Sequence, residues 1–128
     1  MGYTVEMEGV DLHCRSQEDA ERAAEIIHAD PWIHPYYLQV EPVIWEGQPY
    51  LEVLHFQGDH WSEGDARKVW LAIAPHMADG ATLEFQGEGF DRWRIRWDSG
   101  RCYEDTVVST VWSEGVEITA QTEMEEQA

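Results

Sequence analysis

Apolar and polar residues alternate along six stretches of this chain, while two stretches between them carry apolar residues at helical spacing. Alternation with a period of two is typical of a strand that buries one face. In the first stretch the alternation changes phase at Gly9, which indicates a β-bulge. The six predicted strands cover residues 3–12, 39–45, 50–57, 82–86, 91–98 and 101–112, and a short piece at 116–118 alternates as well.

Two helices are predicted between these strands. Ser16 and Ser62 are candidate N-caps, and each is followed by acidic residues in the first turn, where they favour the helix dipole. The first helix should stop at Asp30-Pro31, and the second at Asp79-Gly80. The apolar stripes of the two helices are Ala20, Ala23, Ala24 and Ile27, and then Ala66, Val69, Trp70, Ile73 and Met77.

The order of elements predicts an α+β fold, a two-layer sandwich in which β-α-β-β-α-β, ferredoxin-like, is followed by a two-strand antiparallel meander. The expected spatial order is fourth, first, third and second strand, with the last two strands beyond the fourth. Pro42 cannot donate a ladder hydrogen bond, so the second strand should be an edge. The third strand is apolar on both faces and should be central. We expect one domain over residues 1–121 and a disordered acidic tail over 122–128.

Charge narrows the choice of partners. The formal net charge is −18, and no Lys or Arg occurs from Ala23 to Ala66. Such a field attracts basic proteins and repels nucleic acid and anionic membranes, neither of which we expect as partners. Adaptation to a saline cytoplasm or a need for solubility would give the same composition.

We see no signal peptide and no apolar run near the ~20 residues of a membrane span, which favours a cytoplasmic location. There Cys14 and Cys102 would be reduced thiols, although a bridge between them stays open.

Three arginines, Arg92, Arg94 and Arg96, alternate with apolar residues in the fifth stretch and should face outward. Two interpretations remain open. They are either a cross-strand charge ladder or a site for an anion on the open face of the sheet. The acidic neighbours that a ladder would use are Glu84, Glu104 and Asp105.

No motif in the chain indicates catalysis, a metal or a cofactor. The six histidines lack metal-binding spacing, although His34 and His60 could meet Asp59 at a loop end. Gly87-Glu88-Gly89 joins two strands and lacks the lysine of a phosphate loop. We therefore assign no catalytic residue, no metal ligand and no cofactor, and we lean against an enzyme.

Some short pieces carry a resemblance. The opening Met1-Gly2-Tyr3, the run Trp93-Arg94-Ile95-Arg96-Trp97, and the pairs Gly100-Arg101 and Val111-Trp112 resemble small uncharacterised proteins of actinobacteria and their phages. The resemblance covers about a third of the chain. It implies no activity, because those proteins have none assigned.

The leading hypothesis is a non-enzymatic interaction protein that presents an acidic surface to a basic protein, as immunity proteins, nucleic-acid mimics and phage anti-defence proteins do. One alternative is a small-ligand-binding or enzymatic domain with a pocket between the aromatic loop 31–38 and the sheet, near His34 or His60. Another is a structural homodimer. The expected partner-binding residues are Glu41, Glu46, Glu52, Asp59, Glu63, Asp65, Trp32, Tyr36 and Tyr37.

Overall fold

The protein folds as an α+β structure in the expected order of elements. The computed structural model describes residues 3–108, 111–112 and 115–119, so the predicted tail 122–128 lies outside the described residues. The helices are α1 (Gln17–Ala29) and α2 (Glu63–Ile73), followed by a short 3₁₀ helix, η1 (Ala74–His76). The strands are β1 (Val5–Asp11), β2 (Leu38–Trp45), β3 (Gln48–Phe56), β4 (Thr82–Gly87), β5 (Arg92–Asp98), β6 (Arg101–Val108), β7 (Val111–Trp112) and β8 (Val116–Ile118).

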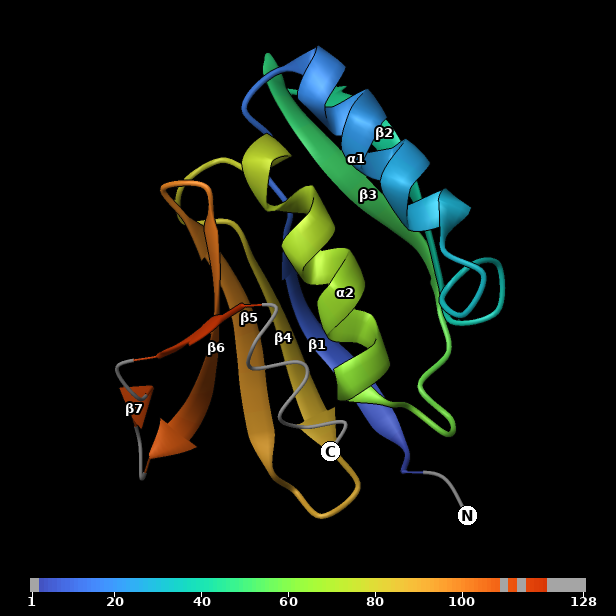
Figure 1. The fold of residues 1–128 in the computed structure, drawn as a ribbon, viewed down its shortest axis with the longest axis vertical. Coiled ribbons are helices and arrows are strands. Elements are labelled where there is room, and N and C mark those ends of the chain that lie inside the picture. The colour runs from blue at the N-terminus through green and yellow to red at the C-terminus, as the bar shows by residue number, and fades with distance from the viewer. Residues whose placement is uncertain (1–2, 109–110, 113–114, 120–128) are drawn as a thin grey trace.

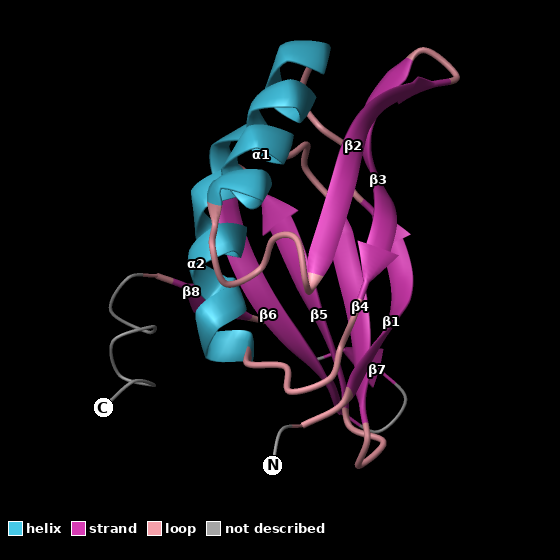
Figure 2. Ribbon diagram, turned by 90° about the vertical axis from the view of Figure 1, so that its right-hand side faces the viewer, coloured by secondary structure: helices cyan, strands magenta, loops and turns pink. Residues whose placement is uncertain are grey.

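These strands form two antiparallel sheets. The large sheet runs β1-β4-β5-β6-β7, with β8 also paired to β6, and β2 and β3 form a separate hairpin sheet. Both helices lie on the same side of the sheets, α1 over the hairpin and α2 over the large sheet (Figure 1, Figure 2). No helix in the described part of the chain is long and apolar enough to cross a membrane.

Among the described residues, backbone hydrogen bonds that link the two sheets are found near the ends of β3. The Leu51 N–H donates to the Leu12 carbonyl at 3.0 Å and the Cys14 N–H donates to the Pro49 carbonyl at 3.0 Å, so the start of β3 lies beside the chain that follows β1. At the other end, the Val5 N–H donates to the Gly58 carbonyl at 3.0 Å. In between, β3 has a ladder only with β2. The third strand was expected to lie between two others. In the structure it pairs fully with β2, and a few hydrogen bonds near its ends connect it to the chain around β1.

Local chemistry accounts for the helix ends. The side chains of Ser16 and Ser62 accept hydrogen bonds from the backbone N–H groups of Asp19 and Asp65, at 3.0 and 3.3 Å, which confirms both predicted N-caps. The second helix ends at Ile73, earlier than predicted. Pro75 has no N–H to continue the α-helical ladder, and the chain tightens into η1 there.

The predicted bulge is present, but a second bulge and a strand reversal were not predicted. The second bulge is in the hairpin, where the β2–β3 register shifts between Gln39 and Val40. The register of β1 against β4 shifts between Met7 and Gly9, which confirms the predicted bulge. The strand predicted over 101–112 is wrong, because its end folds back as β7, whose Val111 pairs with Val108 of β6. An alternating pattern gives no sign of such a reversal, since both halves continue the period of two.

The core lies between the helices and the inner faces of both sheets. Its largest fully buried side chains include Trp70, Trp97 and Phe85, and the Trp97 indole donates to the Trp70 carbonyl at 3.0 Å. Each such side chain contributes about 1.5–3 kcal/mol through burial. Cys14 and Cys102 are both buried and free, as two reduced thiols would be.

Candidate functional site

The outer face of the hairpin sheet carries exposed acidic and apolar side chains together. Leu38, Val40 and Leu51 are buried and define the inner face, so the residues that alternate with them point outward. We call this outer surface the hairpin face. Its residues are Glu41, Val43, Trp45, Tyr50, Glu52 and Leu54.

Two like charges face each other across this surface. Glu41 and Glu52 are direct partners in the β2–β3 register, and both side chains are exposed. Like charges in directly opposite positions destabilise a strand pair, by up to about 1 kcal/mol. Glu46 lies in the turn of the same hairpin. Within the described part of the chain, none of these three carboxylates forms an ion pair.

Apolar groups lie beside these acids. The side chains of Trp45 and Leu54 are 62% and 57% exposed. The Trp45 ring meets the edge of the Tyr50 ring at a centroid distance of 6.0 Å, and Tyr50 lies 4.0 Å from the ring of His13. The hairpin face thus combines a large exposed indole with unneutralised carboxylates.

The aromatic loop 31–38 does not form part of this face. Trp32 stacks on Tyr37 at 4.4 Å, and both rings lie near the buried Trp61, at 5.4 and 5.8 Å. These rings cap one end of the core. Of the aromatic residues predicted to bind a partner, only Tyr36 is largely exposed, at 54%.

The remaining predicted acids lie near the start of α2, at the opposite end of the molecule from the hairpin turn (Figure 1). Asp59 is exposed and accepts from the Thr4 hydroxyl at 3.4 Å. Asp65 is half-buried in the first helical turn, and Glu63 turns inward. The structure therefore places Glu41, Glu46 and Glu52 on one hairpin, with Glu41 opposite Glu52, and does not join the other predicted residues to them.

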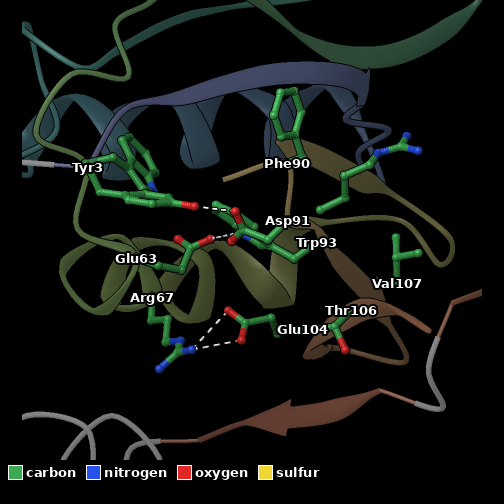
Figure 3. A pocket seen from close by; sticks show the side chains of 11 residues that line it. Tyr3, Glu63, Arg67, Phe90, Asp91, Trp93, Glu104, Thr106 and Val107 are labelled. Carbon is green, nitrogen blue, oxygen red and sulfur yellow. Dashed lines mark hydrogen bonds and ion pairs between the residues drawn. The ribbon is translucent and has the colours of Figure 1, made fainter. Parts of the chain in front are cut away.

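Glu63 lies in a pocket of about 540 Å³ between α2, β5 and β6 (Figure 3). The indole N–H of Trp93 donates to one of its oxygens, and that of Trp70 donates to the other at 3.2 Å. Burial raises the pKa of Glu63 to about 7, and the charge of Glu104 adds to this effect. The two indole hydrogen bonds and Arg67 act in the opposite direction.

Two further contacts join polar side chains that line this pocket. Arg67 donates from one nitrogen to both carboxylate oxygens of Glu104, at 2.8 and 3.0 Å. The Tyr3 hydroxyl donates to Asp91, as the dashed line in Figure 3 marks. The predicted pocket beside the aromatic loop would have held His34 or His60, but neither of these histidines lines this one.

Of the two interpretations left open for the arginine strand, the contacts fit a charge ladder. Asp105 is the one predicted partner that takes part among the described contacts, and Glu8 is a partner that was not predicted. Arg94 and Arg96 both donate from Nε to the same oxygen of Asp105, at 2.7 and 3.0 Å. Arg92 reaches Glu8 on β1 at 3.0 Å. Glu104 was expected beside the arginines, but it points to the helix side because neighbouring residues of a strand face opposite ways.

Asp105 is fully buried beneath this pair of arginines. Burial alone would raise the pKa of its carboxyl group, but the hydrogen bonds from Arg96 and Arg94 outweigh burial and lower it. A buried carboxylate shared by two guanidinium groups is a structural element, and both arginines are committed to it. This arrangement favours the ladder over an anion site.

The structure gives no support to a metal centre in the described residues, where no group of three His, Cys, Asp or Glu side chains could hold an ion. His34 packs against His28 at 4.4 Å, so it is not directed at Asp59. Burial raises the pKa of the Cys14 thiol to about 12, and burial also raises that of Cys102. Neither thiol is therefore suited to act as a nucleophile.

Sequence reasoning missed the pocket around Glu63. The alternation of β5 indicated that Trp93 faces inward, and Ser62 marked the start of α2, so each residue had a local signal. Nothing in either pattern showed that the two would touch, because that contact depends on how the helix lies on the sheet.

No family model matches the chain, and neither does any curated protein or solved structure. The resemblance to actinobacterial and phage proteins therefore stays a prediction.

Proposed function

We propose that this is a non-enzymatic interaction protein whose hairpin face binds a basic protein partner. The observation that carries the proposal is the pair Glu41 and Glu52, which stand opposite each other without a cation, beside the exposed indole of Trp45. The partner would be of the kind that immunity proteins, nucleic-acid mimics and phage anti-defence proteins bind.

Electrostatics supports this choice of partner. A Lys or Arg side chain placed between Glu41 and Glu52 would replace their repulsion with attraction, so the bound state relieves a cost present in the free protein. The net charge of −18 would also speed the encounter with a basic surface. Trp45 supplies a large apolar anchor of the kind that dominates binding energy at interfaces.

We infer a ferredoxin-like order in which β3 neighbours β1. The hydrogen bonds from Leu51 to Leu12 and from Cys14 to Pro49 support it. In that arrangement the hairpin sheet continues the large sheet, and its outer face is presented on the side away from both helices.

Charge reversal tests the proposal. The protein, immobilised, would be used to capture partners from a lysate of its native host, in parallel with the variant Glu41→Lys/Glu52→Lys. A matched control, Glu6→Lys/Glu21→Lys, makes the same change in net charge at two exposed residues outside the hairpin face. We expect a basic protein to be captured by the native protein and the control and to be lost from the hairpin variant.

Equal loss from both variants would show that only total charge matters, and equal retention would show that the hairpin face is not used. A homodimer joined through this face would appear instead as self-association. Sedimentation at micromolar concentration distinguishes it, because our proposal predicts a monomer in the absence of a partner.

A further inference from the structure

The pocket at the start of α2 has the dimensions and walls of a small-molecule site. Its volume of about 540 Å³ lies within the range usual for such sites. Four aromatic residues contribute to its lining: Tyr3, Trp61, Phe90 and Trp93. Figure 3 shows Tyr3, Glu63, Asp91 and Trp93 gathered at its centre. No residue of the hairpin face lines this pocket, so the two surfaces can be tested independently.

The charges in this pocket do not cancel. Arg67 is matched by Glu104, and Arg92 is matched by Glu8 outside the pocket. Glu63 and Asp91 remain, and neither forms an ion pair with any other residue in the described parts of the chain. Their present hydrogen bonds come from neutral donors, the indoles of Trp70 and Trp93 and the hydroxyl of Tyr3.

We infer that this pocket binds a small organic cation, an ammonium group on a compact apolar body, with its charge beside Glu63 and Asp91 and its apolar part against Phe90 and Trp93. Aromatic faces attract cations through the ring quadrupole, and the attraction strengthens where water is excluded. An anion would meet two carboxylates and would find both nearby arginines already matched.

The backbone at Phe90 is a separate observation that supports a binding role. Phe90 has a φ of 67° and its side chain is 81% exposed at the pocket. The left-handed region is unfavourable for a bulky side chain, and such outliers occur preferentially at functional sites. The turn holds this conformation through hydrogen bonds from Phe90 to Gly87 and from Gly87 to Asp91, at 3.0 and 2.8 Å. A large aromatic ring is thus kept at the surface, where it gains nothing from burial.

Protonation of Glu63 should couple to binding. Its pKa of about 7 reflects burial first and then the charge of Glu104, against the effect of Arg67. A cation favours the ionised carboxylate. Affinity should therefore rise with pH through neutrality as Glu63 ionises. The other charged side chains that line the pocket with it are Asp91, Glu104, Arg67 and Arg92.

Three probes that share a branched head with three methyl groups test this inference. Choline carries a positive charge on this head, and dimethylbutanol is its neutral isostere, with carbon in place of the nitrogen. Dimethylbutanoate has the same neutral head and carries a negative charge on its carboxylate. Titration into the full chain, followed by tryptophan fluorescence and calorimetry, should show choline binding about tenfold more tightly than dimethylbutanol. Dimethylbutanoate should bind most weakly of the three. Equal affinity for choline and the alcohol, stronger binding of the anion, or no binding of choline would overturn the proposal.

Two variants identify the site. Glu63→Gln should weaken choline several-fold, leave dimethylbutanol unchanged and abolish the rise in choline affinity with pH. Phe90→Gly should also weaken choline, and it relieves the left-handed backbone, so it keeps the fold intact for the measurement. Glu21→Gln, at an exposed residue of α1 outside the pocket, is the matched control and should bind choline as the native protein does. Choline affinity unaffected by both pocket variants would contradict the assignment.

Discussion

The outer faces of the two sheets deal with charge in opposite ways. On the large sheet, Arg94 and Arg96 share the buried Asp105, and Arg92 reaches Glu8. On the hairpin sheet, Glu41 and Glu52 face each other, and neither forms an ion pair with another described residue. The first arrangement is complete within the protein, whereas the second leaves a charge that only another molecule can neutralise. The comparison separates charges that stabilise the fold from charges available for binding.

The largest expected effect is a loss of unfolding free energy when Asp105 is replaced. Asp105→Asn leaves two guanidinium groups close together over a buried neutral amide, and removing one partner of a buried ion pair costs about 3 kcal/mol or more. Urea unfolding measures this loss. Glu84→Gln is the control, because Glu84 lies opposite Arg94 on the same face but is half-exposed, and it should cost about 0.5 kcal/mol or less. A small effect of Asp105→Asn would mean that the ladder does not stabilise the fold.

An effect of intermediate size is the pH dependence of the unfolding free energy that comes from Glu63. In the unfolded chain this carboxyl group has its ordinary pKa of about 4.5, whereas in the folded protein its pKa is about 7. The folded state therefore holds more protons between these values, and this group's contribution to the unfolding free energy is lost as pH rises through them. Glu63→Gln cannot ionise.

The relevant measurement is the urea midpoint of the native protein and of Glu63→Gln at several pH values from about 5 to about 8. The native protein should lose stability relative to the variant as pH rises. Parallel curves would show that Glu63 ionises as easily in the folded protein as in the unfolded chain.

A smaller effect is expected at the pocket mouth. Phe90→Gly removes a bulky side chain from the left-handed region and from solvent, so the unfolding free energy should stay the same or rise by about 1 kcal/mol. Thermal and urea unfolding measure it. A clear loss of stability would show that the Phe90 ring packs against the fold and is not held there for binding.

The smallest expected effects on stability concern the two facing carboxylates of the hairpin face. Glu41→Gln and Glu52→Gln should each raise the unfolding free energy by a few tenths of a kcal/mol, because each removes the same repulsion. The double variant should gain little more than either single one, and a double-mutant cycle measures this coupling. Strictly additive gains would indicate that the two carboxylates respond to the overall charge of −18 and not to each other.

Much of the fold could be predicted from the sequence, and the part that could not depends on contacts between elements. Periodicity and caps placed both helices, and the phase change at Gly9 located a bulge, because these signals are local. The reversal after Val108 and the separation of β3 from most of β1 leave no local signal. In the site, the base-free stretch 23–66 pointed to Glu41 and Glu52. Asp105 was one of three possible ladder partners, and only the structure shows it buried between two arginines.

Whether the hairpin face binds a basic protein is tested most sharply by the salt dependence of binding between this protein and a purified basic partner. Affinity for the native protein should fall steeply as ionic strength rises, and Glu41→Gln/Glu52→Gln should both weaken binding and flatten that dependence. If the variant bound with the same affinity and the same salt dependence as the native protein, the hairpin face would not be the binding surface.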